Sequence, residues 1–164
     1  MNIIATLRSS KFPTEEEKRL SREKTNEFIK TIPLKKGLKV KLQNVEYLKE
    51  LTISRAAVRN WRSHPHKYVI AKNEAITDIQ KLFKRAEYYG WAEDDIIVNP
   101  NGNSFQKHPD VKYWLYYKVL IYDELSYICV KVTNEGLYVP YCINDQNAWK
   151  SGLVNKIRKN KPLK

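Results

Sequence analysis

The stretch KYWLYYKVLIYDELSYICVKVTNEGLYVPYCI, residues 112–143, decides the fold class. It is rich in aromatic and β-branched residues and is interrupted by the short polar groups DELS and EG, a pattern typical of strands joined by tight turns. The strands are expected at 112–122, 127–134 and 137–143. Pro140 indicates an edge strand or a bulge, because proline cannot donate to the hydrogen-bond ladder. We therefore predict a three-stranded antiparallel meander.

Alternation with period two divides this meander into two faces. One face is mainly apolar and holds Leu115, Val119, Ile121, Ile128, Val130 and Val132, with Tyr113 and Tyr117. The other face holds Trp114, Tyr116, Lys118, Tyr122, Tyr127, Cys129, Lys131 and Thr133. The first face is expected to pack on helices. The second is expected to be a surface of tyrosines and lysines, suited to stacking on RNA bases and neutralising phosphates, although ordinary half-exposed sheet faces have a similar composition.

The chain before the meander predicts helices. A helix between Pro13 and Pro33 begins with the capping-box pair Thr14 and Glu17 and is an arm packed on the body or an interaction segment. Residues 54–63 predict a short helix with Ser54 as its N-cap.

The clearest helical periodicity covers residues 72–90, with Asn73 as N-cap and Gly90 as the C-terminal stop. Residues 38–44 alternate like a short strand, residues 45–54 are ambiguous, and residues 91–110 read as a long loop. The predicted fold is α+β, with N-terminal helices packed on a small antiparallel β-sheet.

Composition places the chain among globular proteins. Its 164 residues are 42% hydrophobic and include 11 tyrosines and four tryptophans. We expect a helical extension at 1–37, an α+β domain at 38–149 and a basic tail at 150–164. The tail is a solvated end or a phosphate-contacting arm. The net charge of +12 favours nucleic acid as the partner, although a high charge also serves solubility.

The cysteines, Cys129 and Cys142, lie in apolar strands and are expected to be buried free thiols. We found no signal peptide and no run long enough for a membrane span, so we expect a cytoplasmic protein, in the producing cell or in a target or host cell that receives it. No cofactor and no metal site are expected. The spacing of the two histidines at 64 and 66 does not match a helical metal motif, and the acidic cluster at 93–95 reads as a solvated loop.

The richest chemistry lies in RNWRSHPHKY, residues 59–68. Metal-independent RNA cleavage needs a base, an acid and a cation that stabilises the phosphorane. The candidate catalytic residues are His64, His66, Arg59, Lys131 and Thr133, and the candidate RNA-binding residues are Arg62, Lys67, Trp114, Tyr116, Lys118 and Tyr127. For each histidine of the stretch, a structural role in a turn or cap is the open alternative. His108 is a weaker catalytic candidate.

The order of these pieces resembles a known family. LTISRAAVRNWRSHPHKY, AITDIQKLFKRAEYYG, YWLYYKVLIYDELSYICVKV and GLYVPYCI together resemble toxin domains of phage and mobile-element polyvalent proteins, which look related to the barnase/EndoU/colicin/RelE-type RNase fold. The resemblance covers roughly residues 38–145. It implies a metal-independent endoribonuclease toxin that acts on tRNA or other RNA. One departure is that the histidine expected just before the YYK of the first meander strand is replaced by Trp114 and Leu115.

Two other functions remain open. A non-enzymatic nucleic-acid binder or phage-encoded defence antagonist would fit the charge and the scarcity of histidines, and a metal-dependent nuclease is the third hypothesis. For a toxin, charge complementarity predicts an acidic immunity or antitoxin protein as a further partner.

Overall fold

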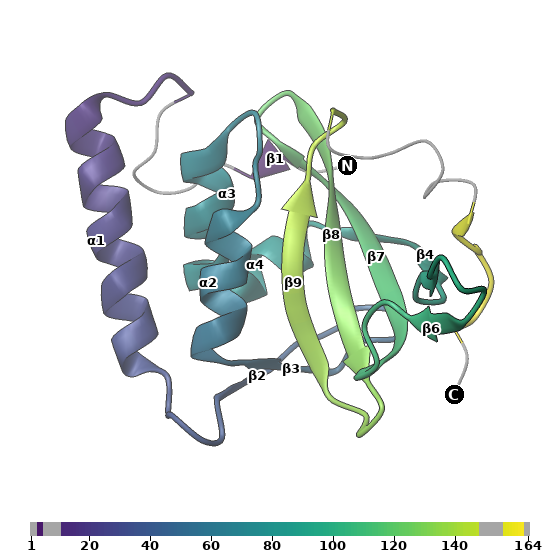
Figure 1. Ribbon diagram of the computed structural model, residues 1–164. Helices are drawn as coiled ribbons and strands as arrows, with labels where there is room; N and C mark the ends of the chain where they lie inside the picture. The colour runs from purple at the N-terminus through teal and green to yellow at the C-terminus, as the bar shows by residue number, and fades with distance from the viewer. Residues whose placement is uncertain (1–2, 5–10, 148–155, 163–164) are drawn as a thin grey trace.

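The computed structural model describes residues 3–4, 11–147 and 156–162. Three long antiparallel strands dominate it: β7 (Val111–Ile121), β8 (Glu124–Thr133) and β9 (Tyr138–Asn144). On the other side of β7 lie β4 (Glu87–Ala92), which is antiparallel to it, and the short β1 (Ile3–Ile4), which is parallel (Figure 1). The predicted α+β class and the predicted meander are confirmed.

The strand β9 lies at the edge of this sheet in the described part of the chain, as Pro140 indicated. The pairing register between β8 and β9 shifts between Cys129 and Val130, opposite the proline. The extra residue at this bulge is Tyr141, which has no Cα partner on β8.

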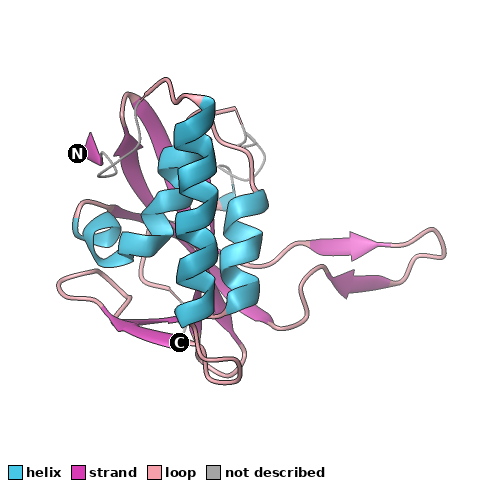
Figure 2. Ribbon diagram, turned by 90° about the vertical axis from the view of Figure 1, so that its left-hand side faces the viewer, coloured by secondary structure: helices cyan, strands magenta, loops and turns pink. Residues whose placement is uncertain are grey.

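Helices α2 (Arg55–Ser63), α3 (Val69–Ala75) and α4 (Ile79–Lys84) cover the apolar face, and α1 (Glu15–Thr31) lies outside them (Figure 1). Figure 2 shows them in front of the sheet. The capping box of Thr14 with Glu17 and the Ser54 cap are present as predicted. The predicted strand at 38–44 corresponds to β2 (Leu38–Lys41), and the ambiguous segment supplies its antiparallel partner β3 (Glu50–Ile53).

The single helix predicted over residues 72–90 is wrong. Helix begins earlier, at Val69, so Asn73 lies inside α3 and is not a cap. A 3₁₀ turn, η1 (Ile76–Asp78), separates α3 from α4, and Asp78 leaves helical geometry with φ −137° and ψ 53°. The aromatic segment after α4 gains strand pairing with β7, which overrides its helical periodicity.

Gly90 therefore lies in β4 and does not stop a helix. The C-terminal segment crosses this strand so closely that a Cβ atom on Gly90 would lie 2.4 Å from Ile157 Cγ2 and 2.6 Å from the Arg158 carbonyl oxygen. The backbone of Arg158 also exchanges two hydrogen bonds with Trp91. The described part of the basic tail is thus docked against β4.

The loop predicted at 91–110 contains a hairpin of β5 (Ile96–Val98) and β6 (Ser104–Gln106). Figure 2 shows it projecting from the body of the molecule. Its strands are only three residues long and mostly exposed, so their sequence carries no burial pattern that would have revealed them.

The assignment of side chains to the two faces of the meander is confirmed except at Tyr122. That residue lies in the β7–β8 turn with φ 54° and packs at the border of the helix-covered core. The expected open aromatic surface is wrong, because a second core forms on the opposite face. Trp114, Tyr116, Tyr127 and Cys129 are buried there with Ala92, Val111 and Cys142.

The N-terminal helix α1 packs on the body. Its residues Ser21, Thr25 and Ile29 are buried, and it contacts both α2 and α3. The Arg62 guanidinium donates hydrogen bonds to Thr25 Oγ1 and Asn26 Oδ1 on α1, at 3.1 and 2.7 Å. Of the two roles left open by the sequence, the described contacts favour packing.

Candidate active site

His64, the first histidine of residues 59–68, caps the C-terminal end of α2. Its Nδ1–H group donates to the Asn60 carbonyl oxygen at 2.8 Å, one helical turn earlier. This bond fixes the ring and leaves Nε2 as the second nitrogen, which has no hydrogen bond to a described residue. His64 is partly exposed.

His66, two residues later, has a different environment. Its side chain is buried, Nδ1 accepts from the Tyr68 backbone N–H, and Nε2 donates to Ser126 Oγ at 2.8 Å. Burial lowers the pKa of His66 to about 4, against the opposing charge of Asp145 and with a smaller contribution from Lys72 in the same direction as burial. His66 is neutral, and both of its ring nitrogens are hydrogen-bonded within the core. It therefore has no free nitrogen with which to act as a base.

Lys72 holds this segment in place from inside the protein. Its side chain is fully buried, and Nζ donates to the carbonyl oxygens of Trp61, Arg62 and His64 at the end of α2. Burial lowers the pKa of Lys72 to about 8, so the ammonium group is still mainly charged at neutral pH. A cation is favourable beside these carbonyls, where the negative end of the helix dipole lies.

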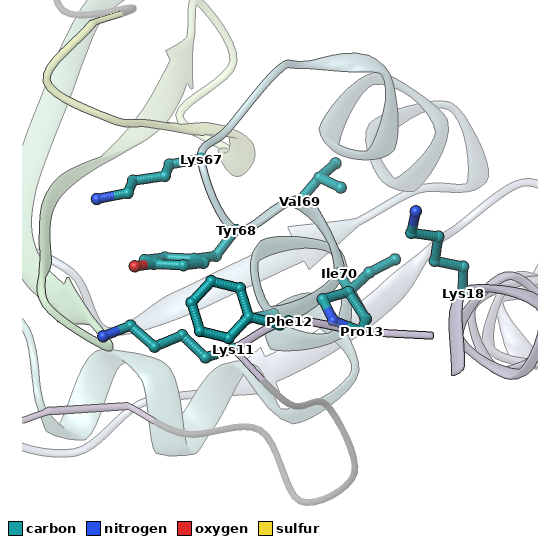
Figure 3. Close-up of a pocket in the computed structure, with 9 residues that line it drawn as sticks. Lys11, Phe12, Pro13, Lys18, Lys67, Tyr68, Val69 and Ile70 are labelled. Atoms are coloured by element: carbon teal, nitrogen blue, oxygen red, sulfur yellow. The ribbon is translucent and has the colours of Figure 1, made fainter. Parts of the chain in front are cut away.

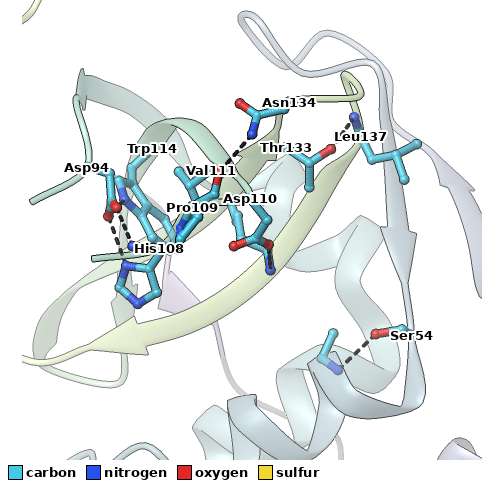
Figure 4. Close-up of polar contacts among 12 residues, drawn as sticks. Ser54, Asp94, His108, Pro109, Asp110, Val111, Trp114, Thr133, Asn134 and Leu137 are labelled. Atoms are coloured by element: carbon cyan, nitrogen blue, oxygen red, sulfur yellow. Dashed lines mark hydrogen bonds and ion pairs between the residues drawn. The ribbon is translucent and has the colours of Figure 1, made fainter. Parts of the chain in front are cut away.

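The third histidine, His108, forms a dyad with Asp94. His108 Nδ1–H donates to Asp94 Oδ1 at 2.8 Å, and the His108 backbone N–H donates to Asp94 Oδ2 at 2.6 Å. The Trp114 indole N–H completes the set at 3.0 Å, and Figure 4 shows Asp94 facing both rings. Burial alone would raise the pKa of Asp94, but the hydrogen bonds from Trp114 and His108 hold it below its usual value.

An ionised carboxylate behind a histidine fixes one tautomer and stabilises the charged ring that forms when Nε2 takes a proton. The His108 side chain is 31% exposed, whereas that of Asp94 is only 3% exposed. The dyad therefore has a partly exposed ring and a protected carboxylate.

Tyr141, the bulged residue of β9, links the two partly exposed histidines. Its ring lies edge-on to His64 at a centroid distance of 5.4 Å, to His108 at 6.2 Å and to Trp114 at 4.9 Å. The Asn60 amide that neighbours His64 also donates to the Tyr141 carbonyl oxygen at 3.0 Å. Two histidines with anchored Nδ1 atoms thus flank one aromatic ring at the edge of the sheet.

A lysine lies next to the dyad. Lys131 pairs in register with Trp114 on β7, and its Nζ bonds to Asp110, two residues after His108, at 2.9 Å. The bond from Lys131 lowers the pKa of Asp110. Because Asp110 is exposed, this ion pair contributes little stability and can exchange for a phosphate.

The remaining predicted site residues are dispersed. Arg59 and Lys67 are exposed, Arg62 bonds to α1, and Lys118 pairs with Glu87 at 3.5 Å. Thr133 Oγ1 accepts the Leu137 backbone N–H in the β8–β9 turn, so its hydroxyl serves that turn. Trp114, Tyr116 and Tyr127 are buried and present no open stacking face.

Sequence reasoning gave His108 little weight and read Asp94 as part of a solvated loop. They lie fourteen residues apart, one before β5 and one after β6, and the hairpin brings them together. The signal that identifies the pair is the hairpin itself. The histidine that the resemblance placed before YYK is absent, but His108 packs against Trp114 at a centroid distance of 5.3 Å.

Comparison with known proteins gave no match to a family model, a curated protein or a solved structure. Within residues 3–4, 11–147 and 156–162, no helix is both long and apolar enough to span a membrane. Those residues also contain no group of three or more metal-binding side chains placed to hold an ion.

Proposed function

We propose that this protein is a metal-independent endoribonuclease whose active site consists of His108 with Asp94, His64 and Lys131. The observation that carries the proposal is the pair of partly exposed histidines around Tyr141, each with Nδ1 bonded and with no hydrogen bond from Nε2 to a described residue. General acid–base cleavage of RNA requires two such proton-transferring groups near one phosphate. The net charge of +12 agrees with a polyanionic substrate.

The reaction needs only these side chains. One histidine removes the proton from a ribose 2′-OH, and the 2′ oxygen attacks phosphorus. The other histidine protonates the 5′ oxygen as its bond to phosphorus breaks, leaving a 2′,3′-cyclic phosphate and a 5′-OH end. We assign the base to His108, because the Asp94 carboxylate stabilises the charged ring, and the acid to His64. Lys131 stabilises the phosphorane by exchanging its Asp110 partner for a phosphate oxygen.

The test is incubation of the purified protein with total RNA in excess EDTA, followed by detection of 2′,3′-cyclic phosphate ends. Discrete fragments from wild type, absent with the H108A and H64A variants, would support the proposal. A K84A variant is a matched control, since Lys84 is exposed on α4. Intact RNA with a folded wild-type protein would reject cleavage and favour the non-enzymatic nucleic-acid binder.

Substrate and biological setting belong to the same proposal. The resemblance to phage and mobile-element toxin domains suggests tRNA as the substrate and an acidic inhibitor as a partner. Sequencing of the fragment ends identifies the substrate, and cleavage confined to ribosomal or messenger RNA would remove tRNA from the proposal.

A further inference from the structure

A second feature of residues 59–68 lies beyond the histidines. Lys67 and Tyr68 line a cavity of about 430 Å³ between the N-terminal ends of α1 and α3. The cavity is also lined by Lys11, Phe12, Pro13, Lys18, Val69, Ile70 and Ala71. Figure 3 shows the Phe12 ring near that of Tyr68, with the ammonium groups of Lys11 and Lys67 on the same side.

The lining combines two kinds of chemistry. Phe12 is 84% exposed, Val69 is 39% exposed, and Tyr68 adds a second partly exposed ring, so a flat apolar group finds an aromatic and aliphatic wall. Three lysines supply the charge, and the lining residues in the described part of the chain include no carboxylate. Exposed aromatic rings beside lysines are the arrangement that binds unpaired bases and their phosphates.

The cations differ in how they are held. Asp123, outside the lining, accepts from Lys11 at 3.2 Å and from the Tyr68 hydroxyl at 2.5 Å and so positions both groups. Lys18 pairs with the exposed Glu15 on its own helix, a contact that a phosphate can displace. Lys67 makes no ion pair with a described residue and lies 5.3 Å from the Tyr68 ring centroid.

The cavity lies beside the same edge strand as the candidate active site. The Lys67 backbone N–H donates to Asp145 Oδ2 at 2.7 Å, just past the end of β9. Asp145 follows Tyr141 by four residues, which corresponds to about 13 Å along an extended strand. A single strand of RNA whose phosphate lies between the histidines can therefore extend toward this cavity and place there a nucleotide that is not adjacent to the cleaved bond.

We propose that the cavity lined by Phe12, Lys67 and Tyr68 binds an unpaired nucleotide, with the base against the rings and the phosphate against the lysines. As a subsite for RNA the inference rests on the proposed function. The chemistry fits a free nucleotide or a nucleotide within a strand, and the experiment separates these sources.

The experiment measures binding without cleavage. Fluorescence anisotropy with a single-stranded DNA 12-mer, which lacks the 2′-OH, is run for wild type, F12A, F12W and K67A. L34A and K84A are matched controls, since Leu34 is 81% exposed and Lys84 is exposed, both outside the cavity. F12A should weaken binding about 5- to 100-fold, the range for loss of one stacked base, and F12W should restore it. K67A should weaken binding and reduce the salt slope by about one.

Titration with uridine 5′-monophosphate then identifies the source. If the wild type binds the mononucleotide and F12A does not, the cavity is a site for free nucleotides. If the wild type binds the 12-mer but not the mononucleotide, the cavity is a subsite for a strand. F12A and K67A affinities equal to those of L34A and K84A would overturn the proposal. If wild type binds through Phe12 but leaves RNA intact in EDTA, the ribonuclease fails and the nucleotide site stands. If RNA is cleaved and F12A leaves both KM and affinity unchanged, the ribonuclease stands and the nucleotide site fails.

Discussion

His66 and His108 show how differently one residue type is used in this molecule. His66 is buried, with one nitrogen accepting from Tyr68 and the other donating to Ser126. His108 is partly exposed, and its one hydrogen-bonded ring nitrogen donates to a carboxylate. The difference lies in what each ring bonds to, and not in its sequence neighbours, since both histidines adjoin a proline. A histidine-rich segment therefore identifies a site only when its hydrogen-bond partners are known.

The largest expected effect comes from removing the open histidine. H108A should lower RNA cleavage by about 10²- to 10⁴-fold, the usual contribution of a general acid or base. The measurement is the rate of appearance of cyclic-phosphate ends in EDTA. Thermal unfolding of the variant should stay close to wild type, because His108 is partly exposed. Cleavage at the wild-type rate by folded H108A would contradict its assignment as the base.

Lys72 tests the support beneath His64. K72M retains an unbranched chain but removes the ammonium donor from the carbonyl oxygens of Trp61, Arg62 and His64, of which Trp61 keeps the His64 backbone N–H. We expect a loss of about 2–3 kcal/mol in unfolding free energy, since buried unsatisfied groups are costly. Urea unfolding at pH 7 measures this loss. K84M, which changes an exposed lysine, serves as the comparison and should differ from wild type by less than about 0.5 kcal/mol.

The buried histidine makes stability depend on pH. The folded-state pKa of about 4 lies below the unfolded value of about 6.5, so the unfolded chain binds the extra proton first. The contribution of neutral His66 to the unfolding free energy is fully present above pH 6.5. It is lost as pH falls from 6.5 to 4, and the loss is on the order of 2–3 kcal/mol by pH 4.

Urea unfolding of wild type and H66Q at pH 7, 6, 5 and 4 isolates this effect. The glutamine amide can donate to Ser126, and it does not titrate. The wild-type curve should be steeper than that of H66Q between pH 6.5 and 4. Parallel curves for the two proteins would show that His66 titrates normally and lies in a more open environment.

Much of the fold follows from local pattern. The Thr14 and Ser54 caps, the alternation through β7 and β8, and the proline at the edge are local signals, and the structure agrees with each. The pairing of β4 depends on contacts with β7, which is distant in sequence. Periodicity alone favoured one helix there because Ile76, Ile79, Leu82 and Phe83 are all buried.

The candidate site was harder to predict than the fold. His64 and His66 lie in the same histidine-rich segment. Which of them is exposed and which is buried depends on which side of the chain faces the core. Tyr141 reaches the histidines because a bulge at Pro140 leaves it unpaired in the register. Asp94 and His108 meet only after two exposed three-residue strands have formed a hairpin. Each of these steps requires tertiary pairing that one sequence does not specify.

The smallest expected effect concerns the carboxylate of the dyad. D94N keeps the size of the side chain but removes the negative charge behind His108. We expect cleavage to fall by about 10- to 100-fold, the range for loss of a carboxylate that orients a metal-bound histidine, and by less than in H108A because the ring remains. The pH–rate profile distinguishes an effect on His108 from a general loss of structure. Loss of the negative charge should shift the acid limb of the profile to lower pH. D94N should unfold below the wild-type temperature, since the amide oxygen can still accept from Trp114 but the amide nitrogen takes the place of Oδ2, which accepts from the His108 backbone N–H. If D94N and H108A were equally inactive, Asp94 would be essential to the proton transfer itself, and the contrast between a core histidine and an oriented one would rest on the charge of its partner.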